Sequence, residues 1–133
     1  MIVVDANVLA YLLLPGPRRE VAGAALEKDP EWVAPSLCRS EFVNFLAQRV
    51  RRGDESLPDA LLLLETALEA LDEGEFPVDP QEVLRTAATS GCTGYDCEFV
   101  VLARRLGVPL VTEDRQVLRA FPGVAVSLEE FAR

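Results

Sequence analysis

Histidine is absent from the 133 residues of this chain, and lysine occurs only once, as Lys28. The absence of histidine excludes a Ser-His-Asp triad, a histidine-based zinc site and imidazole acid–base catalysis. Positive charge is also scarce, because 22 Asp and Glu outnumber 13 Lys and Arg and give a net charge of −9. Binding of nucleic acid through a broad basic face is therefore not expected.

Cysteine and long apolar runs are also limited. The chain has three cysteines, Cys38, Cys92 and Cys97, and no apolar run near the roughly 20 residues that span a bilayer. It opens on a short apolar run without the basic segment of a signal peptide. We expect a reduced, cytoplasmic protein with no membrane contact, in which the cysteines are buried apolar residues.

The composition is that of a folded protein. Half of the residues are hydrophobic and 26% are charged, so the chain can bury a core and is not compositionally disordered. The length is typical of one domain, and we expect a single domain over residues 1–133. No linker, repeat or low-complexity tract interrupts it.

Short β-branched apolar runs alternate with helical patterns along the chain. Because these runs are too apolar for a strand with one wet face, they predict an α/β sandwich around a buried, mostly parallel sheet. Glycine and proline end several of the helices, and Ser36 and the capping box Thr93–Asp96 are expected to begin two of them. Strands are predicted at 2–4, 32–34, 108–112 and 124–126, and helices at 8–13, 21–26, 36–52, 57–71, 80–90, 93–106, 115–121 and 127–131.

The helix predicted at 57–71 has an unusually broad apolar face. Its charged residues Glu65, Glu69 and Asp72 fall on the opposite face. We expect the leucine face to pack into the core, and a dimer surface is the alternative. The leucines that share this face are Leu57, Leu61, Leu64, Leu68 and Leu71.

Three acids are expected to meet at one edge of the sheet. Asp5 ends the first predicted strand, and Asp114 follows the strand at 108–112. The carboxyl ends of parallel strands share one edge, so these side chains should be neighbours. Asp96 begins the helix that leads into the strand at 108–112, which places it near the same edge.

Glu41 is a fourth candidate, because its helical neighbours Leu37, Cys38 and Phe45 are expected to belong to a buried stripe. An unpaired carboxylate there costs several kcal/mol unless it is neutralised, paired or bound to a cation. Asn44, one turn further on, could orient it.

A divalent cation would relieve the repulsion among four such carboxylates. Mg²⁺ or Mn²⁺ takes carboxylate and water oxygens, and this ligand set favours phosphoryl chemistry over a zinc hydrolase. Simpler roles stay open for three of the acids: Asp5 as a turn residue, Asp96 as an acid at a helix start, and Asp114 as a cap.

Four segments resemble, in order and approximate spacing, the motifs of PIN-domain ribonucleases, and most closely those of the VapC-like toxins of toxin–antitoxin pairs. They cover nearly the whole chain. The segments are IVVDANVL (residues 2–9), SEFVNFL (40–46), YDCEFVVLA (95–103) and LVTED (110–114).

This resemblance implies a three-layer α/β/α sandwich with an acidic quartet around Mg²⁺ or Mn²⁺, supported by the polar residues Asn7 and Thr112. It also implies cleavage of single-stranded or loop RNA, a homodimer, and silencing by a cognate antitoxin whose tail blocks the site. Local arginines such as Arg39 and Arg115 could offset the acidic balance near the RNA. The quartet, both catalytic and metal-binding, is Asp5, Glu41, Asp96 and Asp114.

Two other functions fit parts of the sequence. Asp5-Ala-Asn7 stands where haloacid-dehalogenase-like phosphatases carry Asp-x-Asp with a nucleophilic first aspartate. Those enzymes resemble one another in a supporting lysine, and Lys28 has no strand-end context. The second alternative is an inactive scaffold whose acids bind a basic partner.

Overall fold

The computed structural model describes residues 1–71 and 76–133. Within them, four short strands form one sheet in the order β2-β1-β3-β4, and every neighbouring pair is parallel. Val3 lies opposite both Val33 and Leu110, so β1 is an inner strand. The strands are β1 (Ile2–Val4), β2 (Trp32–Val33), β3 (Leu110–Val111) and β4 (Ala125–Val126).

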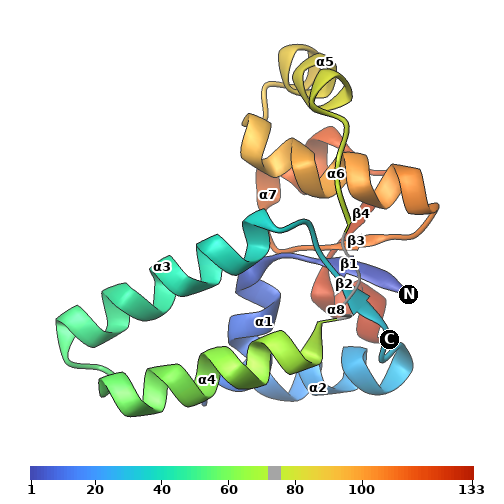
Figure 1. Ribbon diagram of the computed structural model, residues 1–133. Helices are drawn as coiled ribbons and strands as arrows, with labels where there is room; N and C mark the ends of the chain where they lie inside the picture. Colours follow the sequence, from blue (N-terminus) through green and yellow to red (C-terminus); the bar gives the residue numbers. More distant parts are fainter. Residues whose placement is uncertain (72–75) are drawn as a thin grey trace.

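Helices cover both faces of the sheet. Figure 1 shows α5 and α6 on one side and α1, α2 and α8 on the other, while α3 and α4 extend together away from the sheet. This arrangement confirms the predicted three-layer α/β/α sandwich. The helices are α1 (Ala6–Leu13), α2 (Arg19–Lys28), α3 (Leu37–Arg52), α4 (Leu57–Ala70), α5 (Pro80–Ser90), α6 (Gly94–Leu106), α7 (Arg115–Ala120) and α8 (Leu128–Ala132).

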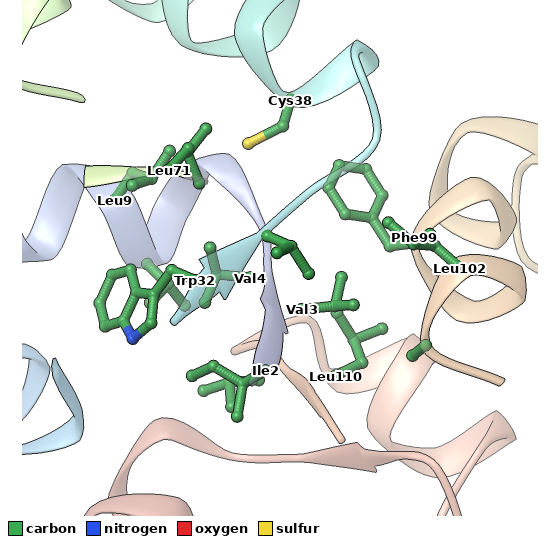
Figure 2. Packing of buried hydrophobic residues seen from close by; sticks show 14 of the residues in the cluster. Ile2, Val3, Val4, Leu9, Trp32, Cys38, Leu71, Phe99, Leu102 and Leu110 are labelled. Atoms are coloured by element: carbon green, nitrogen blue, oxygen red, sulfur yellow. The ribbon is translucent and has the colours of Figure 1, made fainter. Parts of the chain in front are cut away.

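The core is built around β1. Ile2, Val3 and Val4 are all buried, as expected for a strand with helices on both faces. Figure 2 shows them between Trp32 of β2 and Leu110 of β3. The buried strand holds its own carboxyl end rigidly, and that end is where Asp5 begins the next helix.

The predicted helix ends are partly confirmed. Thr93 and Asp96 form a reciprocal capping box at the start of α6, and Gly107 ends that helix with φ 67°. Ser36 does occupy the N-cap position of α3, but its backbone is already helical and its side chain makes no capping hydrogen bond. The Cys38 N–H instead donates to the Pro35 carbonyl at 2.9 Å, so the backbone satisfies this helix start.

The prediction that the leucine face of α4 packs into the core is only partly confirmed. Leu57 and Leu61 are 60% and 56% exposed, whereas Ala60 and Ala67 are buried and Leu64 is partly buried against the core. The small alanine side chains form the fully buried face of the helix and leave Leu57, Leu61 and Leu68 on the outside. Leu71 is buried and pairs with Trp32 as a single bridge, and the polar position Asp72 lies outside the described residues.

All three cysteines are buried and free, as predicted. Burial raises the pKa of the Cys38 thiol, with the negative charges of Asp5 and Glu41 adding to the effect, so this thiol stays protonated. Within residues 1–71 and 76–133, no helix has both the length and the hydrophobicity needed to cross a membrane.

Candidate active site

The sheet order creates a crevice between β1 and β3. From β1 the chain crosses to β2 on one side, while β3 leads to β4 on the other, and ligands bind at such a reversal beyond the carboxyl ends of the strands. A cavity of about 280 Å³ opens there. Its polar lining consists of Asp5, Asn7, Glu41, Asn44, Gln48, Asp96, Thr112 and Asp114. The structure therefore brings the four predicted acids together with Asn7, Asn44 and Thr112, the uncharged polar residues that the sequence also indicated.

Asp5 is held by two fixed donors. Its Oδ1 accepts the Val8 N–H at 3.0 Å, and its Oδ2 accepts the Thr112 hydroxyl at 2.5 Å. Thr112 Oγ1 in turn accepts the Asp114 N–H at 3.1 Å. Thr112 thus connects the acid after β1 to the segment after β3 and fixes their separation.

Asp96 and Asp114 also occupy helix starts. Asp114 Oδ1 accepts the N–H groups of Gln116 and Val117, and Asp96 Oδ2 accepts the Thr93 N–H. In each carboxylate the other oxygen accepts no hydrogen bond from the described residues. The capping roles left open by the sequence are therefore real, and they leave one oxygen of each acid available to a ligand.

Three helix N-termini therefore point towards the cavity, those of α1, α6 and α7. The positive end of each helix dipole interacts favourably with negative charge at the cavity. Within the described residues, none of the four acids that line the cavity forms an ion pair. The site therefore carries concentrated negative charge without a protein counter-charge.

Burial raises the pKa of Asp5 above its usual range. The Thr112 hydroxyl and two backbone N–H groups oppose this shift, and repulsion from Asp114 reinforces it. A partly desolvated carboxylate without an ion pair is costly for the folded chain. A bound cation would remove that cost.

Glu41 lies at the rim of the cavity and not within a buried stripe. The buried residues of α3 are Cys38, Phe42 and Leu46, while Glu41 is largely exposed, which corrects its predicted position. Its carboxylate still loses water at the cavity wall, and this desolvation with repulsion from Asp5, Asp96 and Glu98 raises its pKa to about 6. The predicted burial of Glu41 is therefore wrong, whereas the expected destabilisation of its ionised form agrees with the raised pKa.

This pKa predicts a pH dependence of stability. The folded chain holds the Glu41 proton up to about pH 6, against 4.5 for the ordinary group, so metal-free stability falls as pH rises through that window and levels off above it. The variant Glu41→Gln should not lose this stability. Its free energy of unfolding relative to that of the wild type should therefore increase from about pH 4.5 to about pH 6. Urea unfolding in EDTA measures the difference.

Glu65→Gln is the matched control, since Glu65 is exposed on α4. We expect its unfolding free energy to follow that of the wild type at every pH. A constant difference between Glu41→Gln and wild type across the window would contradict the account.

The donor set fits a hard divalent cation. It consists only of oxygen atoms from carboxylates, amides and one hydroxyl, which suits Mg²⁺ or Mn²⁺. Within the described residues, no three acidic or cysteine side chains lie close enough together, as placed, to hold a metal ion. The carboxylates would therefore have to move closer to one another to bind one, and the cation would offset their mutual repulsion.

Sequence reasoning missed part of the cavity lining. Gln48 lies one turn beyond Asn44 on α3, and Phe45 lines the same cavity. The spacing of 41, 44, 45 and 48 on one helical face could have indicated both residues. Arg39 and Arg115, expected to bring positive charge to the site, do not line the cavity.

The chain is an α/β/α protein with three layers. Its acid-lined crevice lies at the switch point of a parallel sheet. The chain belongs to the PIN domain family, whose sequence profile matches residues 2–123. It is 32% identical over 126 residues to Ribonuclease VapC3 of Pyrobaculum aerophilum, a match that covers 92% of this chain and 96% of that protein.

The fold also matches a solved structure. The crystal structure of PAE2754 from Pyrobaculum aerophilum superposes with a TM-score of 0.79 at 27% identity, covering 98% of this chain and 92% of that one. These matches do not support the phosphatase alternative. Lys28 donates to the Phe131 carbonyl at 2.7 Å and does not line the acidic cavity, so it is not placed to assist a nucleophilic Asp5.

Proposed function

We propose that this chain is a Mg²⁺- or Mn²⁺-dependent endoribonuclease and the toxin of a toxin–antitoxin pair. The observation that carries the proposal is the meeting of Asp5, Glu41, Asp96 and Asp114 in one cavity without an ion-pair partner in the described residues. The similarity to a protein named Ribonuclease VapC3 supports RNA as the substrate and a toxin role.

In this proposal Asp5, Asp96 and Asp114 hold the cation, each with a carboxylate that a helix start already positions. The bound ion would lower the pKa of a water molecule and neutralise charge on the phosphodiester. Glu41 would orient the attacking water as an acceptor at the cavity rim. Attack in line would leave a 5′-phosphate and a 3′-hydroxyl.

Asn7 and Thr112 have supporting roles. Thr112 donates to Asp5 and receives the Asp114 N–H, so it keeps two of the proposed ligands in register. Asn7 lines the same cavity from the first turn of α1. Neither residue carries a charge, and we infer that both position the carboxylates or the substrate.

We propose a homodimer and a cognate antitoxin as the partners. The exposed leucines of α4 give the chain an apolar surface of the kind that oligomers bury.

Three free, buried cysteines fit a reducing cytoplasm. The buried apolar residues form one cluster, which supports a single domain over residues 1–133.

The direct test is an RNA cleavage assay with the purified chain. Cleavage of single-stranded RNA in Mn²⁺ or Mg²⁺ should stop in excess EDTA and return when the metal is restored, because the carboxylates alone supply no cation. The products should carry 5′-phosphates. Cleavage that persists in EDTA would contradict the metal requirement, and the absence of cleavage under every metal would leave the scaffold alternative in place of an enzyme.

A further inference from the structure

A second cavity lies directly beside the acidic one. Its volume is about 350 Å³, and Asn7 and Phe45 line both cavities. It is bounded by α1, by the loop that leads from α1 into α2, and by the part of α3 beyond Phe45. A linear ligand that leaves the acidic cavity past Asn7 and Phe45 would enter this second space.

The charge of the second cavity is opposite to that of the first. Arg18, Arg19 and Arg49 line it, and none of the acidic residues that the structure describes does. Among the same described residues, four carboxylates and no arginine line the acidic cavity. In a chain with a net charge of −9, three arginines around one cavity are notable, although glutamates outside the lining pair with Arg18 and Arg49 and only the charge of Arg19 is unpaired among the described residues.

These arginines keep unused donors. Arg18 pairs with Glu113 and Glu129, and Arg49 pairs with Glu55 at 3.1 Å. A guanidinium has five N–H donors, so such pairs do not exhaust it. The Nε atoms of Arg18 and Arg49 have no acceptor within the described residues, but they are buried and do not face the solvent. The accessible free donors are those of Arg19, which is exposed and forms no ion pair with any described residue.

Aromatic rings accompany the arginines. The Arg18 guanidinium lies 5.6 Å from the ring centre of Tyr11, and that of Arg49 lies 5.9 Å from the ring centre of Phe45. Single-stranded nucleic acid is commonly held by arginines on its phosphates and aromatic rings against its bases. An acidic protein segment would use the arginines but would have less use for the rings.

We propose that this second cavity is an RNA subsite that binds the phosphate and base of a nucleotide next to the one cleaved. The inference rests on the proposed ribonuclease function and deepens it. Glu41 and Arg49 are eight residues apart on α3, which corresponds to about 12 Å along the helix axis. The arginines therefore contact a neighbouring nucleotide and not the reacting phosphate.

The test measures RNA binding apart from cleavage. A short, mixed-sequence, fluorescein-labelled single-stranded RNA is titrated with the chain in EDTA at several salt concentrations, and fluorescence anisotropy reports binding. We expect Arg19→Gln and Arg49→Gln each to weaken binding roughly 5- to 10-fold. The slope of log K against log salt should fall by about 0.7 for each lost phosphate contact.

Arg51→Gln is the matched control. Arg51 is exposed in the last turn of α3, lines neither cavity, and makes the same change in net charge. We expect its affinity and salt slope to equal those of the wild type. Thermal unfolding checks the fold of Arg49→Gln, which loses the Glu55 pair, while Arg19→Gln breaks no ion pair with a described residue.

The two proposals fail separately. If the wild type cleaves RNA in Mn²⁺ and all three variants bind RNA alike, the subsite is overturned and the ribonuclease function stands. If the wild type does not bind this RNA, or if only binding of an acidic peptide depends on Arg19 and Arg49, the subsite is also overturned. A metal-supported cleavage assay that shows no activity overturns the ribonuclease function itself.

Discussion

Replacing Asp96 with asparagine is expected to lower RNA cleavage on the order of 10²- to 10³-fold while the fold is retained. The substitution removes one negative charge from the proposed cation site. It keeps an oxygen that can accept the Thr93 N–H, so the capping box that begins α6 survives. Alanine would instead leave the Thr93 N–H without its side-chain acceptor and destabilise the start of α6, which would confuse the two effects. Cleavage rates and thermal unfolding are measured on the same preparation.

Glu98→Gln is the control for this variant. Glu98 lies on the same helix, close enough to raise the pKa of Glu41, but it does not line the cavity. The control therefore removes the same charge from the same surface and should retain activity within a few-fold. Equal losses in Asp96→Asn and Glu98→Gln would show that general electrostatics, and not a specific ligand, explains the effect.

Asp5→Asn is expected to abolish cleavage and at the same time to raise the thermal midpoint of the metal-free chain. Asparagine caps helices as well as aspartate does, and its amide group can donate to Thr112 Oγ1. Burial raises the pKa of Asp5, which means that its ionised form is less stable in the folded chain than in the unfolded chain. A neutral side chain removes the cost of burying an ionised carboxylate. The cleavage rate should therefore fall while the thermal midpoint rises.

Asp79→Asn provides the matched substitution at another helix start. Asp79 caps α5 by accepting the Gln81 N–H at 2.9 Å, and it is exposed and away from the cavity lining. We expect the cleavage rate to be unchanged. The free energy of unfolding should change by no more than a few tenths of a kcal/mol, which leaves the thermal midpoint close to that of the wild type. A lower midpoint for Asp5→Asn than for wild type in EDTA would contradict the proposed strain at Asp5.

The parts of the site that the sequence predicted correctly follow from local rules. Asp5 and Asp114 each come directly after a buried parallel strand, and strand ends of that kind share one edge of a sheet. Thr93 and Asp96 have the spacing of a capping box, and this spacing places the acid at the start of α6. These acids could therefore be placed near one another without any knowledge of packing.

The errors concern which face of a helix is buried, and this depends on neighbours that are distant in the sequence. In α4, Ala60 and Ala67 are buried while Leu61 is exposed, an outcome that hydrophobicity alone ranks the wrong way round. In α3, a shift of one residue places Phe42 in the core and Glu41 at the cavity rim. The arginine-lined cavity joins Arg18 to Arg49 and needs the tertiary fold to be seen.

The central claim is that the four carboxylates form a site whose charge a divalent cation balances. Calorimetric titration of the metal-free chain with Mn²⁺ tests it most directly, with the double variant Asp5→Asn/Asp96→Asn as the comparison. We expect saturable Mn²⁺ binding by the wild type and no saturable binding by the double variant. The number of protons that the wild type releases on binding should increase as the pH is lowered towards the Glu41 pKa of about 6. A wild-type titration without saturation, or one that the double variant reproduces, would contradict the account.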